Sequence, residues 1–166
     1  MLLDIVMVRE RDDAYLVSSR AGQGLIERDY SRFRYTAEGH DPLGYTGNPR
    51  AVSLMDGGFH DKDSWFAATA ETNHPDALFQ IAQLFDSPRC GDIVVSSELG
   101  WDFMDQGHRA SHGGLEKAEM VVPCVMAGPG VRQGTIPLAR TVDLYPTYLR
   151  FLGIPNYDGE VLNVFL

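Results

Sequence analysis

The stretch that decides the expected fold runs from residue 91 to residue 155 and reads GDIVVSSELGWDFMDQGHRASHGGLEKAEMVVPCVMAGPGVRQGTIPLARTVDLYPTYLRFLGIP. It predicts a strand over 93–97, a polar loop, a second strand over 121–126, a Gly-Pro-Gly turn at 128–130 and a closing helix over 143–152. Both predicted strands are short β-branched runs, which is typical of strands covered on both faces of a sheet. Because chemistry in open α/β sheets lies in loops beyond the carboxyl ends of strands, the polar loop is the predicted site.

Two histidines and three acidic residues lie in or beside this loop: His108, His112, Glu98, Asp102 and Asp105. A neutral imidazole is a good zinc ligand, and carboxylates supply oxygen ligands for a divalent metal. Two histidines four residues apart would share one face of a helix, but glycines flank them in QGHRASHGG, so a loop is predicted. The loop is therefore a candidate site for zinc, with manganese and magnesium as alternatives. The other interpretation is that both histidines are solvated loop residues.

Three segments of the stretch resemble the C-terminal part of the alkaline phosphatase superfamily, nearest its type I phosphodiesterase/nucleotide pyrophosphatase and sulfatase-like branches. These segments are SHGGL (111–115), VVPCVMAGPGV (121–131) and ARTVDLYPTYLRFLGIP (139–155). The resemblance implies hydrolysis of a phosphate ester, diester or pyrophosphate. Bound metals would activate the nucleophile and stabilise charge on the transferring phosphoryl group. The resemblance covers roughly the last 75 residues of the chain.

The resemblance also implies roles for the loop residues. His112 matches the metal-binding histidine of the family's His-Gly motif, Glu98 is a second metal ligand, and His108 is a further candidate. Asp102 and Asp105 are expected beside the metal or facing the substrate.

The chain departs from the family's pattern at two points. Glu98-Leu99-Gly100 stands where the family has Asp-His-Gly, and a leucine cannot bind a metal. No segment matches the family's nucleophilic Thr or Ser with its preceding Asp, so no catalytic residue is assigned in this chain. The N-terminal half is missing from this sequence, another chain supplies it, or the protein has lost activity. Two functions are therefore expected: part of a metal-dependent phosphohydrolase that is inactive as this fragment, or a non-catalytic phosphatase-like module for binding or assembly.

The length and net charge of the chain limit the kinds of partner that it is expected to bind. At 166 residues the chain suits one α/β domain over 1–166, expected to be a fragment of a larger phosphatase-like domain. A net charge of −9 argues against binding to a nucleic-acid backbone, which needs clustered Lys and Arg. An acidic chain can bind a phosphorylated small molecule where bound cations reverse the local field. The other expected partners are a missing N-terminal segment and a second copy of the chain.

The chain shows no membrane or export signal. It has no run of about 18 apolar residues, so no membrane-spanning helix is expected. The start, MLLDIVMVRERDD, lacks a basic leader and a cleavage site, which predicts a cytoplasmic location. Cys90 and Cys124 are predicted to be free, buried thiols.

The first 90 residues complete the prediction. A hairpin is expected from strands at 2–9 and 15–19, and a half-buried strand at 32–36, with Gly22 and Gly24 breaking the chain between them. Residues 38–59 are predicted to be loop, in which His40 and Asp41 are turn residues rather than ligands. Amphipathic helices are predicted over 61–70 and 75–86. The expected fold is α/β: a mixed sheet flanked by helices with an N-terminal β-hairpin, and, by the resemblance, the C-terminal segment of an alkaline-phosphatase-like fold.

Overall fold

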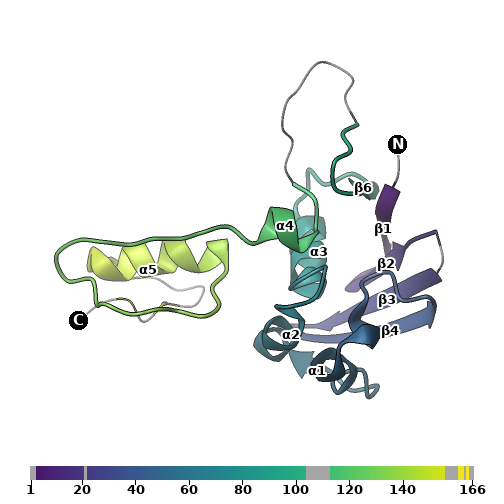
Figure 1. The fold of residues 1–166 in the computed structure, drawn as a ribbon, viewed down its shortest axis with the longest axis horizontal. Coiled ribbons are helices and arrows are strands. Elements are labelled where there is room, and N and C mark those ends of the chain that lie inside the picture. Colours follow the sequence, from purple (N-terminus) through teal and green to yellow (C-terminus); the bar gives the residue numbers. More distant parts are fainter. Residues whose placement is uncertain (1–2, 21, 104–112, 156–160, 163, 165–166) are drawn as a thin grey trace. The chain divides into compact units, whose positions relative to one another are not determined.

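The computed structural model describes residues 3–20, 22–103, 113–155, 161–162 and 164 (Figure 1). The chain divides into two compact units, Met1–Val122 and Pro123–Leu166. The first unit holds the sheet and four of the α-helices, and the second holds the last helix. That the chain is a fragment of a larger phosphatase-like domain stays a prediction.

The first unit is built on an open six-stranded sheet in the order β5-β4-β3-β2-β1-β6. The strands are β1 (Leu3–Arg11), β2 (Ala14–Ser18), β3 (Gly22–Asp29), β4 (Arg32–Gly39), β5 (His60–Asp61) and β6 (Ile93–Ser97). The α/β class is confirmed, but the prediction of a mixed sheet is wrong, because every pairing between the described strands is antiparallel. Short turns follow β1 and β3, and such turns can join only antiparallel neighbours.

The strands β1 to β4 form a meander, in which each strand pairs with the next along the chain. The predicted hairpin is confirmed, with Asp13 in the left-handed region (φ 56°) in its turn. The prediction that Gly22 and Gly24 break the chain is wrong, because both lie in β3. Gly24 is needed there because a Cβ at that position would collide with the Tyr35 ring on β4.

Helices of the first unit cover one face of this sheet. The α-helices are α1 (Pro49–Val52), α2 (Lys62–Thr69), α3 (Ala77–Asp86), α4 (Lys117–Met120) and α5 (Leu144–Phe151); the 3-10 helices are η1 (Tyr45–Gly47) and η2 (Thr141–Asp143). Both predicted helices of the first unit are confirmed, and α3 begins two residues later than expected. Asp61 caps α2 by accepting hydrogen bonds from the amides of Asp63 (3.1 Å) and Ser64 (2.8 Å).

The core lies between the sheet and the helices α2 and α3, which contact β2 and β4 (Figure 1). Trp65 on α2 is 1 % exposed, and its indole N–H donates to the carbonyl of Phe33 on β4 (2.9 Å). The predicted apolar stripe of α3 is buried in this core. The buried core residues are Ile5, Met7, Tyr15, Val17, Ile26, Phe33, Tyr35, Leu43, Tyr45, Ala51, Trp65, Ala77, Leu78, Ile81, Ala82 and Phe85.

The predictions of two strands covered on both faces, and of two buried thiols, are wrong. β6 exists, but it is an edge strand rather than a strand covered on both faces, and Ile93 is 65 % exposed. Residues 121–126 form no strand; Val122 is 65 % and Val125 is 90 % exposed. Both cysteines are free, but Cys90 is half-buried and Cys124 is exposed, so neither is the buried thiol that was predicted.

The second unit contains the predicted turn and closing helix. The amide of Val131 donates to the carbonyl of Gly128 (3.2 Å), which closes the Gly-Pro-Gly turn. α5 ends at Phe151, and Gly153 (φ 68°) follows two residues later, where its amide donates to the carbonyl of Arg150 (3.1 Å). The closing helix was predicted to begin at Asp143, but α5 begins at Leu144. The Asp143 carboxylate does not cap α5 and instead accepts a hydrogen bond from the amide of Arg140 (2.8 Å) at the start of η2.

No helix in the described residues combines the length and the apolar character needed to span a membrane.

Candidate functional site at the end of strand β6

The predicted site residues fall partly outside the described structure. Glu98 follows β6 directly and is half-buried, and Asp102 is exposed four residues later. His108, His112 and Asp105 lie outside the described residues, so their roles stay predictions. The structure therefore describes the two segments that flank the loop, residues 93–103 before it and 113–120 after it.

The segment before the loop forms a tight turn directly after β6. The amide of Trp101 donates to the carbonyl of Glu98 (3.1 Å), and the hydroxyl of Ser97 donates to the carbonyl of Trp101 (2.8 Å). The two bonds fold residues 98–101 back on the strand end. They fix the backbone from which the Glu98 carboxylate projects.

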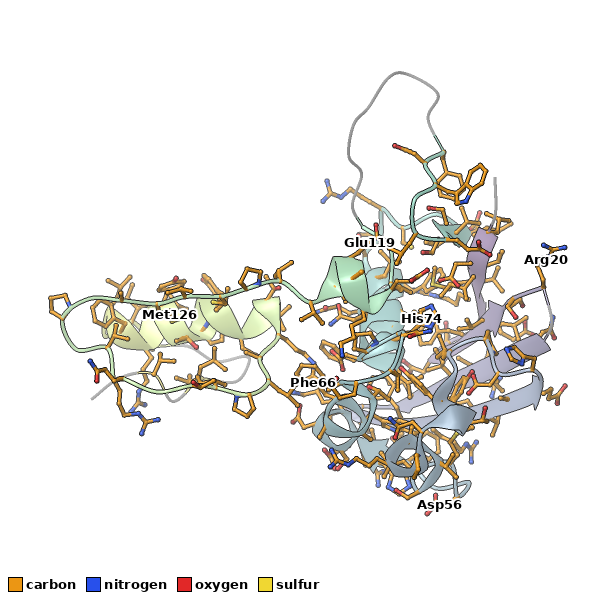
Figure 2. The ribbon with its side chains drawn as sticks, viewed as in Figure 1. Arg20, Asp56, Phe66, His74, Glu119 and Met126 are labelled. Carbon is orange, nitrogen blue, oxygen red and sulfur yellow. The ribbon has the colours of Figure 1, made fainter. Side chains whose placement is uncertain are left out.

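On the other side, the segment 113–120 brings further carboxylates to the strand end. Glu116 accepts a hydrogen bond from the amide of Leu99 through Oε1 (3.3 Å), which ties the two sides of the loop together. Glu119 lies on α4 (Figure 2), where its carboxylate occupies the space that a Cβ on Gly114 would need. The sequence analysis missed both residues, although the spacing SHGGLEKAE places them a few residues after His112.

A buried histidine–aspartate pair lies beneath this region. The Nε2 atom of His74 is 2.8 Å from Oδ2 of Asp4 on β1, and His74 is 6 % exposed (Figure 2). Burial lowers the pKa of His74, but the hydrogen bond and charge of Asp4 outweigh it, and the charge of Glu116 adds to them. The pKa of His74 is therefore raised above its ordinary value. No sequence pattern marks this pair, because its members are 70 residues apart.

Ser96 on β6 lies close to the segment that follows the loop. It is 5 % exposed, and its hydroxyl has no hydrogen-bond partner among the described residues. A Cβ on Gly114 would lie 3.3 Å from that hydroxyl. Gly114 therefore lets the segment after the loop pass directly over the end of β6.

These groups do not by themselves form a metal site. Within the described ranges, no group of three or more His, Cys, Asp and Glu side chains is arranged to hold a metal ion. A catalytic zinc site normally takes three protein ligands. The described donors therefore do not fit a complete metal centre, and no catalytic step through a metal follows from them.

The predicted turn residues in the 38–59 loop have a structural role. Asp41 is 4 % exposed and accepts hydrogen bonds from the Tyr35 hydroxyl (2.6 Å) and from the amides of Leu43 (2.9 Å) and Thr46 (2.8 Å). Burial, followed by the hydrogen bond to Asp41, raises the pKa of Tyr35. Asp41 thus organises the loop that contains η1, and His40 is exposed.

Comparison of the chain with models of protein families, with curated proteins and with solved structures finds no match.

Proposed function

We propose that this chain is the C-terminal part of a metal-dependent hydrolase of phosphoric esters, of the phosphodiesterase/nucleotide pyrophosphatase kind. The observation that carries the proposal is the order of three segments in one stretch: SHGGL, VVPCVMAGPGV and ARTVDLYPTYLRFLGIP. An alkaline-phosphatase-like arrangement of the complete domain is part of the same proposal.

The surroundings of the loop support a cation rather than an anion as the first ligand. Glu98, Glu116 and Glu119 all belong to segments that flank the loop. No Lys or Arg lies in the segment 90–103, and Lys117 in the other segment is paired with Glu71 (2.5 Å). A divalent cation held by His112 and Glu98 would reverse this negative field and admit a phosphorylated small molecule. The hydrogen bond between Leu99 and Glu116 supports the role of Glu98, because it fixes the turn that carries this carboxylate.

The chain alone is proposed to be inactive. It offers one histidine with a family motif, one carboxylate at the strand end and no residue in the context of the family's nucleophile. The remaining ligands and the nucleophile would come from an N-terminal segment or another chain. Hydrolysis assays with nitrophenyl phosphate and bis-nitrophenyl phosphate, with zinc, manganese or magnesium added, should show no appreciable turnover. Robust turnover by the wild-type chain that is lost in His112→Ala would overturn the proposal that the chain alone lacks a complete active site.

The experiment that tests the site is calorimetric titration of the chain with zinc at neutral pH. Wild type should bind zinc weakly, and His112→Ala and Glu98→Gln should each weaken binding further, because too few ligands remain. His40→Ala is the matched control, since His40 is an exposed histidine away from the loop. Tight stoichiometric binding that survives His112→Ala would contradict the proposed site.

A second candidate is a non-catalytic phosphatase-like module for binding or assembly. Leu99 favours it, because it stands where the family has a metal-binding histidine. Reading the DNA upstream of Met1 separates the two proposals. An open reading frame that continues upstream into a strand, a loop with Asp and Thr or Ser, and a later Asp-His pair supports the enzyme, and a native start at Met1 supports the module.

A further inference from the structure

Large hydrophobic side chains are exposed on β6 and on the segment that follows it. Five large hydrophobic residues between 93 and 103 are exposed: Ile93 (65 %), Val95 (40 %), Leu99 (48 %), Trp101 (47 %) and Phe103 (47 %). Exposed apolar side chains that gather in one part of a surface can mark an interaction site. Ile93 and Val95 share one face of the strand, because successive side chains alternate between the two faces.

The strand β6 also lacks the features that protect edge strands from pairing. Its sequence, IVVSS, has no proline and no charged residue, and among the described strands it pairs only with β1. Edge strands are normally protected by charges, prolines or very short length. The opposite edge follows this rule, because β5 has two residues, one of them Asp61, and leads directly into α2. The unprotected edge is therefore the one at β6.

We propose that β6 pairs in antiparallel fashion with β6 of a second copy of this chain, so that two sheets join across a two-fold axis. A two-fold interface brings the same patch of both copies together, which suits a short strand with no charge. In the register centred on Val94, Ile93 of each copy lies opposite Val95 of the other. Aliphatic β-branched pairs of this kind stabilise antiparallel strands.

The flanking charges select this register. A pairing centred on Val95 would place Asp92 opposite Glu98 of the second copy, and like charges directly opposite are destabilising. The pairing centred on Val94 places Asp92 opposite Ser96, and Glu98 opposite Cys90, the neighbour of Arg89. Arg89 is exposed, so the two-fold axis creates two attractions between Arg89 and Glu98.

The neighbouring strand extends the apolar contact. Val6 and Val8 on β1 lie opposite Val95 and Ile93 in the register of the sheet, and they are half-buried on the same face. Joining two copies therefore brings together two such groups of four aliphatic side chains. A pair of five-residue strands buries less surface area than a standard protein–protein interface. We therefore expect a reversible dimer whose population rises with concentration.

Sedimentation equilibrium over a range of concentrations tests the proposal with the full 166-residue chain. Wild type should reach twice the chain mass, and Val95→Lys should weaken association at least tenfold by placing a charge in the strand pair. Val52→Lys is the matched control, because Val52 is a similarly exposed valine (45 % against 40 %) on α1. A wild-type chain that stays monomeric throughout, or equal weakening by both variants, overturns the proposal.

Charge exchange tests the register without placing a charge inside the strand. Arg89→Glu and Glu98→Lys should each weaken association, and the double variant should restore it. Failure of the double variant to restore association overturns the proposed register. Hydrogen exchange adds a direct readout, since the β6 amides should gain protection as the concentration rises, and unchanged protection in a dimeric sample would place the interface elsewhere.

Discussion

The buried carboxylate of Asp41 leads to a quantitative prediction for the stability of the first unit. Asp41→Ala removes the acceptor of three hydrogen bonds, from Tyr35 (2.6 Å), Leu43 (2.9 Å) and Thr46 (2.8 Å). Thr46 is exposed, so water can replace its lost acceptor. The Tyr35 hydroxyl and the Leu43 amide stay buried, since these residues are 1 % and 0 % exposed.

The magnitude follows from the two donors that lose their acceptor. Each buried donor without a partner costs about 1–3 kcal/mol, so Asp41→Ala should lower the free energy of unfolding by about 2–6 kcal/mol. Urea unfolding followed by circular dichroism measures this loss. Asp12→Ala is the control, because an exposed turn aspartate should change the free energy by no more than about 0.5 kcal/mol.

A double-mutant cycle isolates the buried pair. Tyr35→Phe removes one of the two donors, so Asp41→Ala should cost about 1–3 kcal/mol less in that background than in wild type. Additive losses would show that the hydroxyl and the carboxylate are not coupled. A loss for Asp41→Ala as small as that for Asp12→Ala would refute the structural role assigned to the loop.

Three further predictions concern other parts of the chain. The pKa of His74 is raised by Asp4, so the stabilisation is fully present below the unfolded value of about 6.5 and is lost as the pH rises through the folded value. The melting temperature of wild type should fall over that window relative to His74→Gln, and parallel pH profiles would contradict the pairing. Ile81→Ala should cost about 2–5 kcal/mol because Ile81 is fully buried, whereas Leu84→Ala, 42 % exposed on the same helix, should cost much less; equal losses in urea unfolding would contradict the packing of α3. Gly153→Ala should destabilise the end of α5 by about 1 kcal/mol because φ is 68°, and unchanged helical signal on heating would argue against this conformation.

The local elements could be predicted because their patterns are local. The stripe of Leu78, Ile81, Ala82 and Phe85 has the period of a helix and predicts α3, and the alternation of Arg and aromatic residues at 32–36 predicts β4. The closing helix predicted over 143–152 is confirmed as α5 for the same reason, because its hydrogen bonds join residues close in sequence.

The same patterns could not predict which strands are buried or which residues pair with each other. β-branched runs occur at 93–95 and at 121–122, but the first forms an edge strand and the second lies in an exposed segment. Composition does not say which strand ends a sheet, because the order of strands depends on contacts far apart in the chain. The pairing of His74 with Asp4 could not be predicted either, because these residues are 70 positions apart in the chain.

Of the candidate site, the position of Glu98 at the end of a strand could be predicted, since the β-branched run at 93–95 predicts a strand over 93–97 that ends just before it. Glu116 could not, because its contact with Leu99 joins residues 17 apart across the loop. The histidines at 108 and 112 stay predictions, and so does the metal.

The order of the strands has a consequence for how the first unit folds. β1 to β4 pair with their neighbours along the chain, so these three pairings close short loops and can form early. β6 pairs with β1 only after the chain has passed through α1, α2 and α3, which makes it the contact with the largest loop to close. During synthesis the meander is therefore available before β6 leaves the ribosome, and until then the edge of β1 stays open to any other strand.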